Sequence, residues 1–326
     1  MHRLYFDLGS ETIRMSADSS RKRPITEPAV VAHRLGEIIA VGLEAERMLG
    51  RTPSGLDAER AFEGGSVRSP KLAQALIRSF LARVARRSWQ RPEIVIALGS
   101  GATALDRRAL NLLAREAGAA RVTFAALPTC RALGLELPIF EPRGTLLIDV
   151  GASRTRIDLL SLGRSVQSAT LDDAGDSIDE AIARRLREQF NLMVGPRSAQ
   201  TLKHDLLGGD AQEVSVYGRD LVSGLPRGLA VQRGDLEGPA VQLAERIAQA
   251  VQEVLRDVSP ELVADVAEGG VYITGGSSRL LALRERLPQL LSLPLHCDES
   301  PEESITSGLV RLADRSVGGT TLRKTA

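Results

Sequence analysis

Short apolar runs alternate along the chain with stretches in which apolar residues recur at helical spacing. The apolar runs predict strands over 3–8, from 12 onward, and over 29–32, 37–41, 94–98, 121–126, 145–150, 154–160, 165–171, 213–217, 228–232 and 271–274. The helical spacing predicts helices over 70–86, 103–117, 129–133, 177–190, 198–206, 241–258 and 279–287. An alternation of strands and helices on this scale is typical of an α/β fold.

Two apolar strands end in the same pattern. Residues 4–10 read LYFDLGS and residues 146–152 read LLIDVGA, and a second strand follows each, so each predicts a β-hairpin. The backbone N–H groups of such a turn can bind phosphate, and an Asp at the strand end can hold a hydrated cation. A single Asp-x-Gly hairpin is explained more simply by the preference of Asp and Gly for turns. Because two copies open two matching halves, we expect a duplicated fold that clamps a triphosphate between two domains.

A third glycine-containing segment follows the strand at 271–274. Residues 273–278 read ITGGSS and lead into a predicted helix. The simpler interpretation is a tight strand-to-helix turn, since glycine tolerates unusual backbone angles. The alternative is a close approach of the backbone to a nucleotide, assisted by the partial positive charge of a helix N-terminus. Together with both hairpins, the second interpretation is favoured.

Composition narrows the class of protein. The chain has 326 residues, 42 Lys and Arg against 41 Asp and Glu, and a net charge of +1, which argues against a nucleic-acid binder. Its two cysteines exclude a disulfide scaffold and fit a reducing compartment. No apolar run approaches the roughly 20 residues of a membrane helix, and no signal-peptide core precedes the first strand. We therefore expect a cytoplasmic protein with, at most, peripheral membrane contact.

Further segments carry a family resemblance over nearly the whole chain. Besides the two hairpins they are VGLEA at 41–45, MLGRTP at 48–53, RRA at 107–109, AGDSIDEAI at 174–182, SGLP at 223–226 and TGGS at 274–277. Together they resemble the bacterial actin-like MreB/Mbl family. The GLEA, LGRTP and SGLP stretches have no generic role in phosphate binding, so they distinguish this family from sugar kinases and heat-shock ATPases of the same fold.

The resemblance implies an α/β, actin-like (duplicated, RNase H-like) ATPase fold with two domains, each carrying a small inserted subdomain. Domain I is expected over 1–142, with its insertion at about 22–68. Domain II is expected over 143–326, with its insertion at about 183–250, and a helix near 304–314 is expected to pack back on domain I. The implied cofactors are ATP and Mg²⁺.

The resemblance also assigns residues to the nucleotide. Those expected to bind it are Asp7, Gly9, Ser10, Glu11 and Thr12 in phosphate loop 1, Gly151, Ala152, Ser153 and Arg154 in phosphate loop 2, Gln200 and Lys203 near the adenosine, and Gly275, Gly276, Ser277 and Ser278. Asp7 and Asp149 are expected to hold Mg²⁺ through water.

Several departures from the family pattern bear on hydrolysis. The family places Glu-Glu-Pro where this chain has Ala126, Leu127 and Pro128, so no carboxylate stands there to position an attacking water, and we name no catalytic residue. In loop 2, Ala152 and Ser153 bring Cβ atoms to positions where the family has glycine.

Charge also changes in both loops. Glu11 brings a carboxylate beside the expected phosphates, and Arg154 is expected to pair with phosphate or with Glu11. Gln200 stands where the family usually has Glu. From all these departures we predict slow or lost ATP hydrolysis and weakened ATP binding.

The single tryptophan is the main candidate for membrane contact. Trp89 lies between Arg87 and Arg91 in a predicted helix-to-strand loop, a setting that suits an anionic lipid interface. A Trp that caps the core beneath the loop is an equally good interpretation. Cys130 has no His nearby in sequence, so we interpret it as a buried apolar residue rather than a nucleophile.

The resulting hypothesis is a cytoskeletal protein that forms or joins actin-like filaments on the inner face of the cell membrane and organises cell-wall synthesis and cell shape. Its expected partners are copies of itself, MreB-family relatives and membrane proteins of cell-wall synthesis, with no nucleic acid. Two alternatives stay open. One is a non-polymerising regulator of true MreB filaments, and the other is an active ATPase or phosphotransferase of the actin fold.

Overall fold

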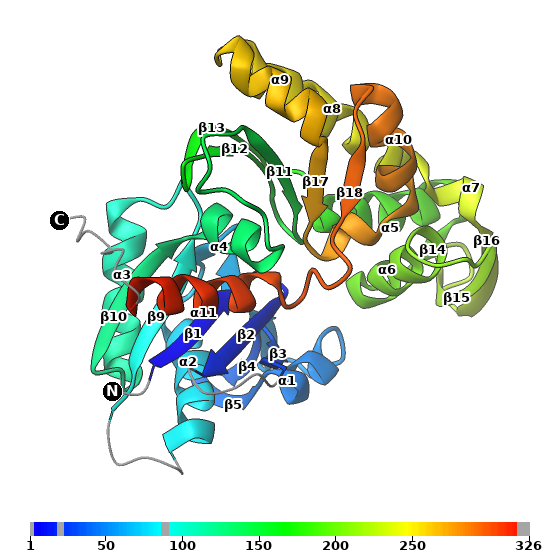
Figure 1. Ribbon diagram of the computed structural model, residues 1–326. Helices are drawn as coiled ribbons and strands as arrows, with labels where there is room; N and C mark the ends of the chain where they lie inside the picture. Colours follow the sequence, from blue (N-terminus) through cyan, green and yellow to red (C-terminus); the bar gives the residue numbers. More distant parts are fainter. Residues whose placement is uncertain (1–2, 18–22, 86–90, 318–326) are drawn as a thin grey trace. The chain divides into compact units, whose positions relative to one another are not determined.

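The structure is a computed structural model that describes residues 3–17, 23–85 and 91–317 (Figure 1). It divides into two compact units. Unit 1 is formed by residues 1–142, 160–165 and 300–326, and unit 2 by residues 143–159 and 166–299. In the described ranges, no helix combines the length and apolar character needed to cross a bilayer.

Unit 1 is built on a five-stranded sheet with the order β10-β9-β1-β2-β3. Its strands are β1 (Arg3–Leu8), β2 (Thr12–Ala17), β3 (Ile25–Pro28), β9 (Glu93–Leu98) and β10 (Arg121–Ala126). The first three form an antiparallel meander, β9 pairs with β1 in parallel, and β10 pairs with β9 in parallel. The apolar runs predicted as strands therefore form the buried centre of the sheet.

Two helices, α2 (Pro70–Ala85) and α3 (Ala104–Ala117), contribute to the larger apolar core of unit 1. Phe80 of α2 packs edge-on against Phe6 of β1, with ring centroids 5.8 Å apart. The start of α3 is fixed by a capping box, in which the Thr103 hydroxyl accepts the N–H of Asp106 and the Asp106 carboxylate accepts the N–H of Thr103. The helix ends at Gly118, as its sequence predicts.

A second apolar cluster in unit 1 joins α4 (Leu127–Gly134) to α11 (Ser304–Val317), which lie side by side (Figure 1). Cys130, Ile305 and Leu309 are buried in it together with Tyr5. The backbones approach so closely that a Cβ on Gly308 would lie 1.7 Å from the carbonyl oxygen of Cys130. Glycine is therefore required at this crossing.

The remaining elements of unit 1 are small. A three-stranded sheet has the order β5-β4-β6 and carries helix α1, and a two-stranded sheet pairs β7 with β8. These elements are β4 (Val30–Arg34), β5 (Glu37–Val41), α1 (Leu43–Met48), β6 (Asp57–Arg60), β7 (Phe62–Glu63) and β8 (Ser66–Val67). They lie within the segment expected to form the inserted subdomain of domain I.

Unit 2 repeats the sheet of unit 1. Its strand order is β13-β12-β11-β17-β18, so three consecutive strands are again joined by two later ones: β17 pairs with β11 in parallel, and β18 pairs with β17 in parallel. The strands are β11 (Thr145–Val150), β12 (Thr155–Ser161), β13 (Arg164–Leu171), β17 (Val271–Thr274) and β18 (Leu295–Cys297). In both sheets the first hairpin is the one with the Asp-x-Gly pattern, which is the duplication that the sequence indicates.

The rest of unit 2 consists of helices and of a small three-stranded sheet with the order β14-β15-β16. The helices are α5 (Gly175–Phe190), α6 (Pro196–Leu202), a π-helix η1 (Lys203–Leu207), α7 (Arg233–Leu236), α8 (Gly238–Arg256), α9 (Pro260–Gly269), a 3₁₀ turn η2 (Gly276–Arg279) and α10 (Leu281–Leu291). The small strands are β14 (Leu192–Met193), β15 (Glu213–Asp220) and β16 (Pro226–Gln232).

Two predicted helices differ in the structure. The helix expected over 198–206 is α-helical only to Leu202 and then widens into the π-helix η1. The helix expected from Arg279 begins at Leu281, because Leu280 has an extended backbone (φ −64°, ψ 124°) between the 3₁₀ turn and α10. The glycines of residues 273–278 therefore lead into a single 3₁₀ turn and not directly into an α-helix.

Candidate nucleotide-binding site

Phosphate loop 1 is the turn of the β1–β2 hairpin in unit 1. Asp7 lies near the end of β1 and is paired directly with Arg14 in the antiparallel register. The Arg14 Nη1 atom lies 3.3 Å from the Asp7 Oδ2 atom, and the two side chains are only 15% and 8% exposed. The hairpin was predicted to present the Asp7 carboxylate to a metal cation. Its second strand also provides the Arg14 guanidinium, which pairs with that carboxylate.

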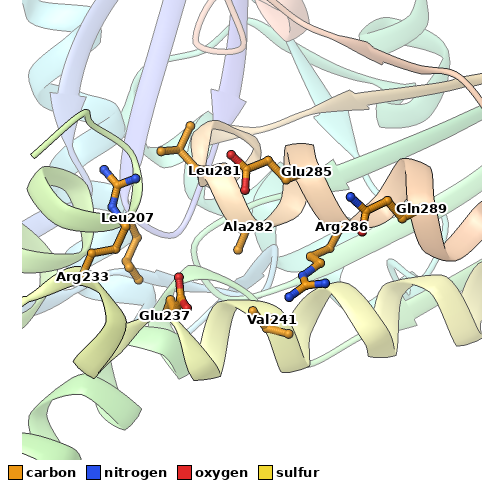
Figure 2. Close-up of a pocket in the computed structure, with 9 residues that line it drawn as sticks. All are labelled: Leu207, Arg233, Glu237, Val241, Leu281, Ala282, Glu285, Arg286 and Gln289. Atoms are coloured by element: carbon orange, nitrogen blue, oxygen red, sulfur yellow. The ribbon is translucent and has the colours of Figure 1, made fainter. Parts of the chain in front are cut away.

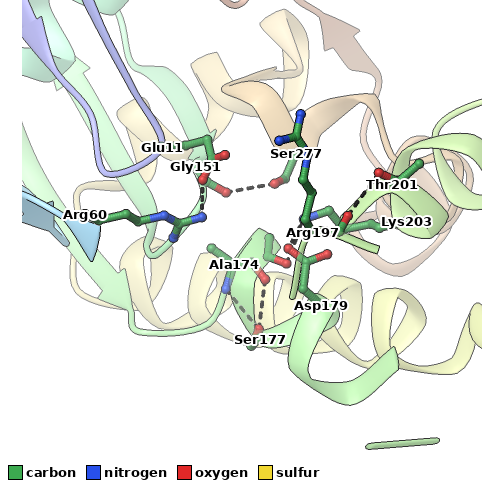
Figure 3. A network of polar contacts seen from close by, with 11 residues as sticks. Glu11, Arg60, Gly151, Ala174, Ser177, Asp179, Arg197, Thr201, Lys203 and Ser277 are labelled. Carbon is green, nitrogen blue, oxygen red and sulfur yellow. Dashed lines mark hydrogen bonds and ion pairs between the residues drawn. The ribbon is translucent and has the colours of Figure 1, made fainter. Parts of the chain in front are cut away.

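The next residues of loop 1 are tied to the small elements of the same unit. Glu11 forms an ion pair with Arg60 at the end of β6 (Figure 3). The Ser10 hydroxyl accepts a hydrogen bond from the N–H of Gly64 at 2.9 Å, and the Glu11 carbonyl accepts one from the N–H of Ala29 at 2.8 Å. The extra carboxylate that Glu11 brings to this loop is therefore neutralised within unit 1.

The turn itself requires glycine at its first position. A Cβ on Gly9 would lie 2.6 Å from the carbonyl oxygen of Thr12. Contacts of this length do not occur for real Cβ atoms, so the tight turn is specified by Gly9. Gly9 and Thr12 therefore shape the loop through their backbones.

The start of α4 has no acidic residue in its first turn. Ala126 is exposed, whereas Leu127 is buried in the cluster that contains Tyr5 and Cys130. Position 127 thus serves apolar packing, which an ionised carboxylate would disrupt. In the same cluster, burial and then the Asp7 carboxylate raise the pKa of the Cys130 thiol to about 12, so it stays protonated, in agreement with its interpretation as an apolar core residue.

Phosphate loop 2, between β11 and β12 in unit 2, is anchored by its own backbone and by the start of α5. The N–H of Gly151 donates to the carbonyl of Arg154 at 3.0 Å. The first amides of α5 donate to the loop, Gly175 to Gly151 at 3.2 Å and Asp176 to Ala152 at 2.7 Å. The N-terminus of α5 therefore holds the conformation of loop 2.

Arg154 has a partner that the sequence did not indicate. Its Nε atom lies 3.1 Å from the Asp172 Oδ1 atom, and the two side chains are 38% and 87% exposed. The sequence predicted phosphate or Glu11 as partners, and pairing with Asp172 was missed because it depends on how the residues after β13 fold back beside the loop.

The two adjacent glycines after β17 differ in their surroundings. Gly275 has φ +89°, and a Cβ there would lie 2.4 Å from the Val150 carbonyl oxygen and 2.6 Å from Asp149 Oδ1. A Cβ on Gly276 would meet nothing within 4 Å. Gly275 is therefore required for packing against β11, whereas Gly276 leaves open space beside the backbone.

The two serines that follow are also buried. The Ser277 hydroxyl donates to the Gly151 carbonyl at 2.8 Å, which links η2 to loop 2 (Figure 3). The Ser278 hydroxyl oxygen is buried and has no hydrogen-bond partner among the residues that the structure describes. A buried polar atom without a hydrogen-bond partner costs free energy. Among the residues of segment 275–278, Ser278 is therefore the one whose hydroxyl would be stabilised by a bound ligand or water.

The Lys203 side chain contacts the first turns of α5. Its Nζ atom donates to the Gly175 carbonyl at 2.9 Å and lies 2.7 Å from Asp179 Oδ2 (Figure 3). Gln200 lies one turn earlier, on α6. Of the residues expected in unit 2, the structure thus brings Lys203, Gly151 and Ser277 together around the N-terminus of α5.

A pocket of about 170 Å³ lies elsewhere in unit 2, where α10 faces the start of α8 (Figure 2). Its lining mixes apolar side chains with charged ones and includes none of the residues predicted to bind nucleotide. The lining residues are Leu207, Arg233, Glu237, Val241, Leu281, Ala282, Glu285, Arg286 and Gln289. The described ranges contain no group of three or more His, Cys, Asp or Glu side chains placed to hold a metal.

Comparison with known sequences places the chain in one family. A family model described as MreB/Mbl protein matches residues 2–318. The cell shape-determining protein Mbl of Bacillus subtilis (strain 168) is 32% identical over 291 residues, 87% of each chain. The cell shape-determining protein MreB of Escherichia coli (strain K12) is 30% identical over 296 residues, which span 87% of this chain and 85% of that protein.

Solved structures agree on the fold. Crystal structures of MreB5 of Spiroplasma citri, bound to ADP or to AMPPNP, match with a TM-score of 0.91 at 24% identity over 97% of each chain. A MamK double helical filament matches with a TM-score of 0.79 at 23% identity, over 96% of this chain and 99% of that one. The predicted actin-like α/β fold is thereby confirmed, and the chain belongs to the MreB/Mbl family of cell shape-determining proteins.

Proposed function

We propose that this protein is an MreB-like cytoskeletal protein that binds ATP and forms, or joins, actin-like filaments. The observation that carries the proposal is the repeated sheet, in which each unit places one Asp-x-Gly hairpin at the same position of the strand order. The buried Ser278 hydroxyl and the open space beside Gly276 support a ligand at the second loop. The structurally similar MreB5 is known bound to ADP and to AMPPNP.

Nucleotide binding is tested by isothermal titration calorimetry with ADP. Replacing Gly276 by Val fills open space without a backbone clash, so we expect the fold to persist and the affinity to fall by about tenfold or more if a ligand occupies that space. Gly234→Val, inside α7 and also with nothing near its Cβ, is the matched control. Equal affinities for all three proteins would place the nucleotide elsewhere.

We further propose that ATP hydrolysis is slow or absent. The first turn of α4 offers no carboxylate to orient a water, and Leu127 is held in the apolar cluster. Phosphate release by the purified protein is therefore expected to be well below that of Bacillus subtilis Mbl under the same conditions. A rate equal to that of Mbl would contradict this proposal and favour the alternative of an active ATPase or phosphotransferase.

Filament formation separates the main proposal from the regulator alternative. A polymer-forming protein should pellet alone in the presence of ATP, whereas a non-polymerising regulator should pellet only together with an ordinary family member. Sedimentation with and without ATP, alone and mixed with Bacillus subtilis Mbl, distinguishes the two.

The cellular setting of the proposal is the inner face of the cell membrane, where the filaments would organise membrane proteins of cell-wall synthesis. The candidate for lipid contact is Trp89. It belongs to the segment 86–90, which lies outside the described residues. We expect Trp89→Ala to reduce co-sedimentation with anionic liposomes. Unchanged co-sedimentation would favour the interpretation of Trp89 as a core cap.

A further inference from the structure

We infer that Arg14 takes the place of a divalent cation at Asp7, so that nucleotide binding by this protein does not require Mg²⁺. The inference rests on the proposed nucleotide binding and concerns the metal requirement of that same site. The sequence predicts Asp7 and Asp149 as the holders of hydrated Mg²⁺, and the two lie in different units. The inference rests on the contacts of Asp7 within unit 1.

The position of Arg14 is fixed by the hairpin. The antiparallel register sets it directly opposite Asp7, and directly opposed cross-strand side chains are close enough to interact. The Nη1–Oδ2 distance of 3.3 Å is that of an ion pair, and both side chains are largely buried. Since the guanidinium is always charged and is covalently part of the strand, the Asp7 carboxylate has a permanent cation.

The Asp7 carboxylate and the Arg14 guanidinium together carry no net charge, so the pair attracts a hydrated Mg²⁺ ion only weakly. Mg²⁺ gives up its water shell reluctantly and is bound by one or two carboxylates together with the phosphates of a substrate. An arginine already paired with Asp7 cancels much of the attraction that the carboxylate offers to a second cation. The Asp7 side of the site thus does not fit a metal as the sequence alone predicts.

The rest of the described loop 1 shows the same arrangement. Glu11, the other carboxylate of the loop, is paired with Arg60 of the same unit. The Arg14 Nε atom is buried and has no hydrogen-bond acceptor among the described residues, and its Nη1 atom lies beside Asp7. Both loop carboxylates are balanced by arginines, and a polyphosphate approaching the loop would meet no uncompensated negative charge that a metal must offset.

The test is the affinity for ADP, measured by calorimetry in MgCl₂ and again in EDTA. We expect the wild-type dissociation constants in the two solutions to agree within about threefold. Arg14→Leu frees the Asp7 carboxylate and should make binding weaker in EDTA than in MgCl₂ by about tenfold or more. Arg14→Lys keeps the positive charge and should behave as the wild type does. The control is Arg143→Leu, which removes an exposed ion pair with Glu268 in unit 2, outside loop 1.

The outcomes are separable. Wild-type binding that is more than about tenfold tighter in MgCl₂ overturns the inference but leaves the proposed function in place. No ADP binding in either solution overturns the proposed function and the inference with it. If Arg14→Leu does not fold, as judged by circular dichroism, the wild type and Arg14→Lys decide the question, because loss of metal independence in either one contradicts the role of Arg14.

Discussion

The Lys203 Nζ atom lies 2.7 Å from the Asp179 Oδ2 atom, and the side chains are only 4% and 12% exposed. Lys203 is the first residue of the π-helix η1, and Asp179 lies one turn into α5. The same ammonium group donates to the Gly175 carbonyl at the start of α5. This buried pair therefore connects the segment after α6 to the helix that anchors phosphate loop 2.

Replacing one member of this pair should destabilise the protein strongly. Lys203→Met leaves a buried carboxylate without its cation, and losses of about 3–5 kcal/mol are typical of such changes. The double variant Lys203→Met/Asp179→Leu removes both charges and should recover a large part of the loss. Chemical denaturation followed by circular dichroism measures the free energy of unfolding of each variant.

The control is an exposed ion pair of the same unit. Arg143 Nη2 lies 2.8 Å from Glu268 Oε2, with side chains 48% and 76% exposed. Arg143→Met should cost less than about 1 kcal/mol, since solvent screens such pairs. Equal losses for Lys203→Met and Arg143→Met would show that burial of the first pair has no energetic consequence.

The crossing of α4 and α11 gives a second prediction. A Cβ on Gly308 would lie 1.7 Å from the Cys130 carbonyl oxygen, so Gly308→Ala must push the helices apart and should cost at least about 1–3 kcal/mol. Gly234→Ala in α7 has open space and should be neutral or stabilising by up to about 1 kcal/mol. Thermal unfolding compares the two. A Gly308→Ala variant as stable as the wild type would mean that the helices cross less closely.

Much of the sheet architecture follows from the sequence because its strands are apolar runs with clear turn residues between them. The repeated Asp-x-Gly pattern predicts a duplicated fold with one hairpin opening each half. The order in which the later strands join each sheet depends on pairings between distant residues, such as that of β1 with β9, and was not predicted. Helix α9 was missed, and only Val266 among its side chains is buried. The π-helix after Leu202 was also missed, because its sequence continues the helical spacing of α6.

The candidate site was predicted as a set of residues but not as a set of contacts. Asp7, Glu11 and Lys203 were named for their places in family segments, whereas their partners Arg14, Arg60 and Asp179 were not. Arg60 is 49 positions from Glu11, and sequence periodicity carries no information on such a pairing. A signal for Arg14 did exist, since counting outward from the Gly9 turn sets it opposite Asp7.

Cys130 provides a prediction about reactivity. Because burial and the Asp7 carboxylate raise the pKa of its thiol to about 12, it should not react with iodoacetamide at pH 8 while the protein is folded. Cys297 is exposed and should react. Mass spectrometry of the alkylated peptides, with and without denaturant, tests this. Rapid labelling of Cys130 in the folded protein would contradict the burial that its packing against α11 implies.

The loop between β15 and β16 should depend on pH through Asp220. The Asp220 Oδ1 atom accepts the N–H groups of Val222 at 2.9 Å and Ser223 at 2.8 Å, and Oδ2 lies 2.6 Å from Arg227 Nη1. The hydrogen bond from the Ser223 backbone is the main cause that lowers the pKa of Asp220 below its ordinary value of 3.8. The ionised carboxylate therefore fixes the loop that exposes Val222 and Leu225.

A lowered pKa in the folded state stabilises the protein at pH values above the ordinary value, and this contribution is lost as the pH falls through the native pKa. Asp220→Asn should thus reduce the free energy of unfolding at pH 7 and have a progressively smaller effect as the pH is lowered from 3.8. Asp210→Asn, at an exposed aspartate, controls for the loss of one charge and should have little effect at pH 7. If the Asp220→Asn difference is the same at pH 7 and at the lowest pH where the chain stays folded, the ionised carboxylate does not hold this loop.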